Sequence, residues 1–93
     1  MVIGTVQVYL AAEWVYSLKE KRTVVKSLTE KIKHKFNVAV AEVAHQDVHQ
    51  TIVIGIACVT NDSAHANSMI DHVVRFIEQN TDAVVTDVVM EIF

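Results

Sequence analysis

Hydrophobic side chains recur along this chain with two different periods, and the order of these periods restricts the fold more than any other feature. Residues 1–10 alternate, with Val6 and Val8 on one side and Gln7 and Tyr9 on the other, which predicts a β-strand. Residues 51–60 are β-branched and almost continuously apolar, as is typical of a central strand. Val-rich segments at residues 38–43 and 84–92 predict two more strands.

Two other segments have the helical period of about 3.6 residues. Ser17, followed three residues later by Glu20, matches a capping box and predicts a helix that continues to about residue 35. N-cap residues at 61–63 predict a second helix that ends near Gln79. The apolar stripes are Leu18, Val25, Leu28, Ile32 and Phe36 in the first helix, and Ala66, Met69, Ile70, Val73 and Ile77 in the second.

Together these segments give the order β-α-β-β-α-β in a single domain that spans residues 1–93. Right-handed crossovers place both helices on one face of a four-stranded antiparallel sheet, with the strand order 4-1-3-2. The sequence therefore predicts an α+β fold of the ferredoxin-like kind, a sandwich of one sheet and two helices.

Composition narrows the class of protein. Apolar side chains make up 52% of the chain, which excludes a disordered tail. No apolar run reaches the roughly 18 residues of a membrane span, and the N-terminus lacks a secretory signal, so we expect a cytoplasmic protein without a membrane partner. The lone Cys58 is interpreted as a buried apolar residue. No set of catalytic nucleophile residues and no glycine-rich phosphate loop is visible, so we expect no cofactor and favour a non-enzyme.

The sheet face away from the helices is predicted to be unusually apolar. We expect Val6, Ile54 and Val88 to point toward the helices. The opposite face then carries Ile3, Tyr9, Ala39, Ala41, Val43, Val53, Ala57, Val59, Val85 and Val89. Because a large exposed apolar patch usually marks an interaction surface, we expect a homodimer or a larger homo-oligomer. The alternative is that strand ends and sheet twist hide much of this face.

Basic residues are concentrated in the first predicted helix. Residues 17–36 contain seven of the eight Lys and Arg side chains and two acidic ones, whereas the rest of the chain is acidic. At about 100° per residue, Lys19, Arg22, Lys26 and Lys33 fall within an arc of about 60° beside the apolar stripe. Such a row can follow the phosphates of a nucleic acid. An ordinary solvated helix face, or pairing with acidic residues of a neighbouring copy, would give the same pattern.

Trp14 and Tyr16 come just before this helix and offer rings on which an unpaired base can stack. Alternatively, the two rings close the end of the core. The strands predicted to be central carry only Tyr9 as an aromatic residue, so base stacking on the sheet, as in RNA-recognition domains of this fold, is not expected. A nucleic-acid site would therefore use the basic helix and the segment before it.

His45, Asp47 and His49 alternate in the segment after the second strand, with Glu42 nearby. Imidazole and carboxylate groups suit Zn²⁺ or another divalent ion, and in an extended segment the three side chains would project to one side. The spacing matches no established zinc motif, so a polar hairpin loop is the alternative interpretation and no metal is expected by default.

Two segments are specific enough to indicate a family: SLKEKRTVVKSL at residues 17–28 and FNVAVAEVAHQD at residues 36–47. The chain resembles the YlxP-like family, small bacterial proteins with a domain of unknown function, along essentially its whole length. The resemblance implies a ferredoxin-like fold and a cytoplasmic bacterial protein. The family's genes often neighbour those of translation and ribosome-maturation factors, which implies a link to RNA.

The family pattern maps onto residues 17–22 and onto Glu42, His45, Gln46 and Asp47. Where this chain has His49, an aromatic residue is common in the family, which argues against a shared metal site.

Three functions are compatible with these observations. The leading hypothesis is a non-enzymatic module that binds RNA or the ribosome through the basic helix. The second is a homo-oligomeric interaction or regulatory domain that uses the apolar sheet face. The third is a metal-dependent hydrolase with Glu42, His45 and Asp47 in its site.

Overall fold

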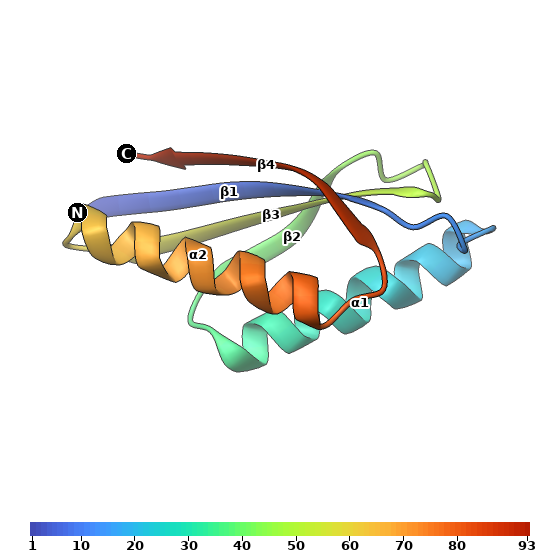
Figure 1. The fold of residues 1–93 in the computed structure, drawn as a ribbon, viewed down its shortest axis with the longest axis horizontal. Coiled ribbons are helices and arrows are strands. Elements are labelled where there is room, and N and C mark those ends of the chain that lie inside the picture. Colours follow the sequence, from blue (N-terminus) through green and yellow to red (C-terminus); the bar gives the residue numbers. More distant parts are fainter.

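The computed structural model describes residues 1–93, and its six elements follow the predicted order (Figure 1). They are β1 (Val2–Ala11), α1 (Leu18–Lys35), β2 (Ala39–Ala44), β3 (Thr51–Thr60), α2 (Ser63–Gln79) and β4 (Val84–Ile92). The predicted bounds of every strand agree with these to within one residue. The two periods in the sequence therefore locate the elements correctly.

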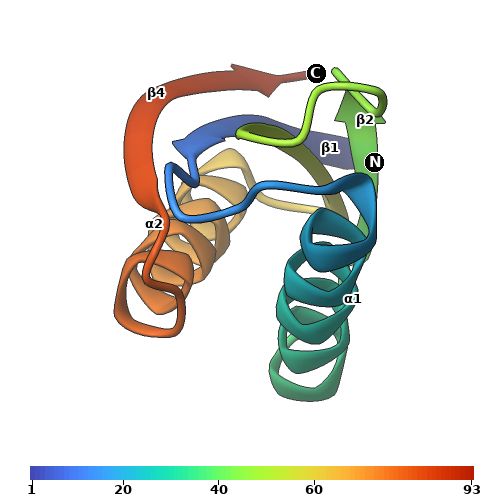
Figure 2. The ribbon, with the colours of Figure 1, turned by 90° about the vertical axis from the view of Figure 1, so that its right-hand side faces the viewer.

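The four strands form one antiparallel sheet in the order β2-β3-β1-β4. Val8 of β1 lies opposite Ile54 of β3 on one side and opposite Val88 of β4 on the other. Both helices lie side by side on the same face of the sheet (Figure 2). This arrangement confirms the predicted ferredoxin-like fold and the strand order 4-1-3-2.

The start and end of α1 are set by local sequence. Ser17 has an extended backbone (φ −149°, ψ 157°), and its Oγ accepts a hydrogen bond from the Glu20 amide at 3.1 Å, as an N-cap does. The chain becomes extended again at Phe36, which caps the C-terminus of the helix. Lys33 and Lys35 in the last turn oppose the negative end of the helix dipole.

The second helix is capped in the same way by a short polar side chain. The carboxylate of Asp62 accepts a hydrogen bond from the Ala64 amide at 3.2 Å. Four residues spaced at helical intervals, Ala66, Ile70, Val73 and Ile77, bury one face of α2. Neither helix combines the length and the hydrophobicity that crossing a bilayer requires.

One hydrophobic core lies between the sheet and the helices. Val6, Val8 and Leu10 of β1 are exposed by 1% or less and belong to the same cluster as Leu28 and Ile32 of α1. Because β1 supplies alternate residues to this core, its period of two is a direct consequence of having one buried face.

Gly4 marks the place where α2 comes closest to the sheet. A Cβ atom at this position would lie 2.9 Å from Cδ1 of Ile70, 3.1 Å from Sγ of Cys58 and 3.2 Å from Cβ of Ala66. The site therefore has no room for a side chain. Cys58 itself is a free cysteine with 3% exposure, which confirms its interpretation as a buried apolar residue.

The sheet face away from the helices, which we call the outer face, differs in two places from the predicted pattern. A β-bulge leaves Thr86 without a partner, so Val85 lies opposite Leu10 and packs against the core. The prediction that Val85 is on the outer face is therefore wrong, because one extra residue reverses the side to which a strand's side chains point. Val53 lies opposite Tyr9 on the outer face by register, but it is fully buried.

Candidate nucleic-acid interface

The four basic residues predicted to contact nucleic acid lie on one exposed strip of α1. Lys19, Arg22, Lys26 and Lys33 are all exposed, and none has a carboxylate oxygen within 4.0 Å. We call these four residues the basic ridge. Because none of the four forms an ion pair within the chain, they can attract anions from solution.

Lys21 is the exception among the basic residues of α1, because only 1% of it is exposed. Its Nζ donates hydrogen bonds to the backbone oxygens of His45 and Val48, both at 2.5 Å, and lies 2.8 Å from Oε2 of Glu42. That carboxylate oxygen is buried and accepts no hydrogen bond of regular geometry, so the attraction to Lys21 is ionic. It is the only ion pair in the chain.

Through these hydrogen bonds and this ion pair, Lys21 links the start of α1 to β2 and to the β2–β3 connection. His45 in this connection has a φ of 55°, in the left-handed region that costs free energy for a residue with a side chain. Lys21 donates to the carbonyls of His45 and Val48 in this partly buried connection, and the His45 carbonyl also accepts a hydrogen bond from the Val48 amide at 3.0 Å. Three residues on which the family resemblance rests, Lys21, Glu42 and His45, therefore meet in one place.

The sequence contains a signal for this role of Lys21. The residue stands three positions after Leu18 and four before Val25, so it continues the apolar stripe of α1 toward the core. A charged residue in such a stripe requires a buried partner of opposite charge or several hydrogen-bond acceptors. Counting Lys21 only with the other basic residues of the segment misses this requirement.

The residues considered as metal ligands are not gathered into a site. His45, Asp47 and His49 lie in or beside the β2–β3 connection, but no three His, Cys, Asp or Glu side chains are placed to hold a metal ion together. Glu42 is already paired with Lys21. The left-handed backbone at His45 also removes the extended geometry that would align alternate side chains. The metal-dependent hydrolase stays a prediction without geometric support.

The two aromatic residues before α1 are both exposed. Tyr16 is 76% exposed and Trp14 is 43% exposed. The residue between them, Val15, is fully buried and belongs to the core cluster. Val15 therefore closes this end of the core, and most of the Tyr16 surface is open to solvent.

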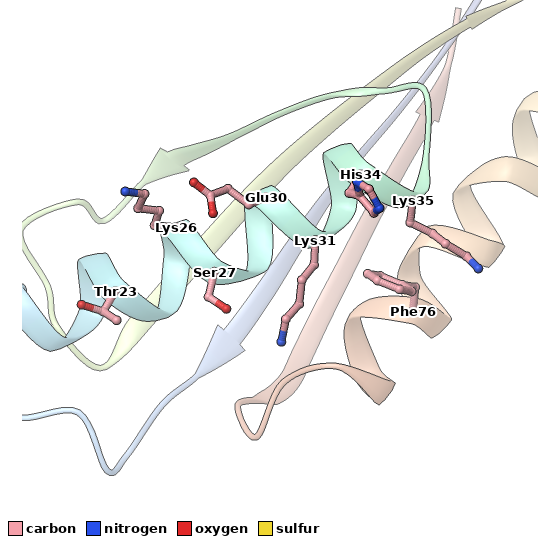
Figure 3. A pocket seen from close by; sticks show the side chains of 8 residues that line it. All are labelled: Thr23, Lys26, Ser27, Glu30, Lys31, His34, Lys35 and Phe76. Atoms are coloured by element: carbon pink, nitrogen blue, oxygen red, sulfur yellow. The ribbon is translucent and has the colours of Figure 1, made fainter.

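A groove runs between α1 and α2. One section of about 540 Å³ is lined by Trp14, by Lys31 of α1 and by the residues from Gln79 to Asp82 after α2. A second section of about 820 Å³ lies mostly on α1: seven of its residues, among them Lys26 and Glu30, line it together with Phe76 of α2 (Figure 3). The two sections adjoin at Thr23, Ser27 and Lys31 of α1, which line both. We call this feature the interhelical groove.

Trp14 lines only the section without Lys26, which is the one member of the basic ridge that lines the other section. In Figure 3, Lys26 of the ridge projects to one side of the helix and Lys31 to the other. At about 100° per residue, Lys31 lies about 150° around the helix axis from the middle of the ridge. The structure thus places Trp14 and Lys31 along the same section of the groove, a pairing that the sequence does not indicate.

Comparison of its sequence with known proteins relates the chain to proteins of unknown function. Residues 3–90 match the family described as "Protein of unknown function (DUF503)". The uncharacterized protein YlxP of Bacillus subtilis (strain 168) is 37% identical over 62 residues, which cover 67% of each chain.

Two solved structures share the architecture. A de novo designed protein with a ferredoxin fold matches with a TM-score of 0.61 and 16% identity, covering 99% of this chain and 85% of the design. The de novo designed protein Foldit4 matches with a TM-score of 0.51 and 15% identity, covering 99% and 94%. At these identities the likeness shows the fold alone.

Proposed function

Because the chain belongs to the DUF503 family, whose function is unknown, we propose from its own surface that it is a non-enzymatic module that binds RNA, free or in the ribosome, through the basic ridge. One observation carries the proposal: Lys19, Arg22, Lys26 and Lys33 are exposed on one strip of α1 and have no carboxylate partner. The rest of the chain is acidic, so the attraction of a polyanion is local to this strip. A cytoplasmic location is part of the same proposal.

The length of the ridge suits a nucleic-acid backbone. At a rise of about 1.5 Å per residue, Lys19 and Lys33 are separated by about 21 Å along the helix axis. Phosphates along one strand of a duplex advance by about 3.4 Å along its axis, so each of the four cations can meet a different phosphate. Each contact releases counterions, which makes the affinity independent of base sequence and dependent on salt.

Filter binding of RNA over a range of salt concentrations tests this proposal. Four phosphate contacts on a single strand predict a slope of about −3 for the logarithm of the association constant against the logarithm of the salt concentration. The substitution Lys26→Glu is expected to weaken binding and to reduce the magnitude of the slope by about 1. Arg75→Glu is the matched control, since Arg75 is the one basic residue outside α1 and the charge change is the same. No binding at low salt, or an equal loss from both substitutions, would contradict the proposal.

The edge strand β4 favours a second candidate function, that of a homo-oligomeric interaction domain. By register, Val88 and Met90 lie on the helix side of the sheet and Val89 on the outer face, yet all three are 40–43% exposed. On the outer face the apolar surface continues at Val43 and Val59, which are 49% and 66% exposed. A long apolar edge strand with unpaired backbone groups is a template for pairing with another chain, and a second copy would cover it.

Light scattering at micromolar concentration tests this candidate. The expected result is a mass of at least twice the 10.4 kDa of one chain. Val89→Lys, which places a charge on both the edge and the outer face, is expected to give a monomer. Asn67→Lys changes an exposed residue of α2 and is expected to leave the mass unchanged. A monomeric wild-type protein would remove the candidate.

A further inference from the structure

We propose that the interhelical groove binds one unpaired nucleotide of a single-stranded RNA segment, with its base against the indole of Trp14 and its phosphate near Lys31. The inference rests on the proposed RNA binding and adds a preference for single-stranded over duplex RNA, which the basic ridge alone would not give. The ridge contacts phosphates, which duplex and single strand share, whereas the groove contains an aromatic ring that only an unpaired base can reach.

The size and lining of the groove suit a nucleotide. The section beside Trp14 has a volume of about 540 Å³, within the range of about 300–1,000 Å³ that is usual for small-ligand sites. With 43% of its surface exposed, Trp14 has ring surface that the core does not use. Stacking of a base on an aromatic side chain contributes roughly 1 to 3 kcal/mol and tolerates any base.

The charged residues that line the groove determine where the phosphate and the base of a bound nucleotide lie. Lys31 and Lys35 of α1 are exposed cations without an ion-pair partner, and both line the groove. Asp82 lines the section that contains Trp14, and its carboxylate repels phosphate. Glu30 lines the section with Lys35, whereas Lys31 is the one Lys or Arg that lines the section with Trp14, so the phosphate is placed at Lys31 and the base against Trp14.

Two amide side chains line the same section of the groove and can bind the edge of a base. Gln79 supplies both a donor and an acceptor. The Nδ2 of Asn80 donates to the backbone oxygen of Phe76 at 2.8 Å, which leaves its amide oxygen as an acceptor. Unstacked bases are commonly held by this combination of an aromatic face and polar groups at the base edge.

The chain contains a probe for this site, since Trp14 is its only tryptophan. The protein is titrated at low salt with a short oligouridylate and, separately, with a blunt-ended RNA duplex. Anisotropy of a label on the RNA reports binding at any surface, while Trp14 fluorescence reports the groove. We expect both RNAs to bind and only the oligouridylate to quench Trp14.

Substitutions distinguish RNA binding in the interhelical groove from RNA binding on the basic ridge. Trp14→Ala is expected to weaken oligouridylate binding roughly 5- to 150-fold, which is the stacking contribution converted to affinity, and to leave duplex binding unchanged. Trp14→Phe retains a stacking surface and is expected to keep most of the affinity. Lys31→Gln should weaken the single strand more than the duplex. Tyr16→Ala should have a smaller effect than Trp14→Ala, because Tyr16 does not line the groove.

The outcomes distinguish the two proposals. Oligouridylate binding without quenching of Trp14 would overturn the proposed nucleotide site in the groove and leave the proposal for the basic ridge unaffected. The same conclusion would follow if Trp14→Phe behaved like Trp14→Ala. The absence of binding by either RNA would overturn both. If Trp14→Ala fails to fold, the quenching experiment and Trp14→Phe still decide the question.

Discussion

Replacing Lys21 by Met tests the conclusion that one buried lysine holds the β2–β3 connection to α1. Methionine keeps most of the alkyl chain of lysine, so packing around the stem changes little, but it has no ammonium group. The carboxylate of Glu42 then loses its only charged partner, the carbonyl of Val48 loses its Lys21 donor, and the carbonyl of His45 keeps only the amide of Val48 as a donor. The substitution therefore isolates the polar contribution of Lys21.

The expected loss of stability follows from the burial of these groups. Removing one partner of a buried ion pair costs about 3–5 kcal/mol. Because the Glu42 side chain is 18% exposed, water can reach part of it, and we take the lower end, about 3 kcal/mol. In a domain of this size each kcal/mol lowers the melting temperature by about 4–8 °C, so the melting temperature should fall by about 12–24 °C.

Urea unfolding followed by far-UV circular dichroism measures the change. The double substitution Lys21→Met with Glu42→Leu is expected to be more stable than Lys21→Met alone, because no unpaired carboxylate remains. Arg22→Met is the matched control: the next residue of the helix is exposed and unpaired, and the expected change is within about 0.5 kcal/mol. A loss below about 1 kcal/mol for Lys21→Met, or strictly additive effects in the double variant, would refute the reasoning.

Three further predictions concern the fold. Gly4→Ala is expected to lower the free energy of unfolding by about 1–3 kcal/mol, because its Cβ would lie 2.9 Å from Cδ1 of Ile70; an unchanged melting curve would contradict the packing described here. Ser17→Ala should cost about 1 kcal/mol in chemical unfolding through loss of the hydrogen bond to the Glu20 amide, and Ser17→Gly should cost less. The Cys58 thiol, 3% exposed, should react with a thiol reagent only as the protein unfolds, so rapid labelling in native buffer would be the contrary result.

The elements and their order were predictable because both hydrophobic periods are local properties of the chain. The caps at Ser17 and Asp62 could also be recognised, since a capping side chain bonds to an amide only two or three residues away. The strand order then followed from the element order and the right-handedness of crossovers.

Three features of the structure could not be predicted, and each depends on contacts between distant segments. Lys21 meets Glu42 and His45 only because the β2–β3 connection folds back over the start of α1. Trp14 and Lys31 line the same section of the groove only because the segment before α1, α1 itself and the end of α2 border it together. The bulge that turns Val85 into the core arises from the pairing of β4 with β1.

The sequence alone thus determined where the strands and helices lie, which faces they bury except at Val85, and where the positive charge is concentrated, because neighbours a few residues apart decide these properties. The tertiary structure decided which of the basic side chains is neutralised. Lys21, with the same chemistry as Lys19 or Lys26, becomes a buried structural residue because a carboxylate and two carbonyls reach it from another part of the chain. The other two remain exposed and free to meet an anion, since no such partner reaches them.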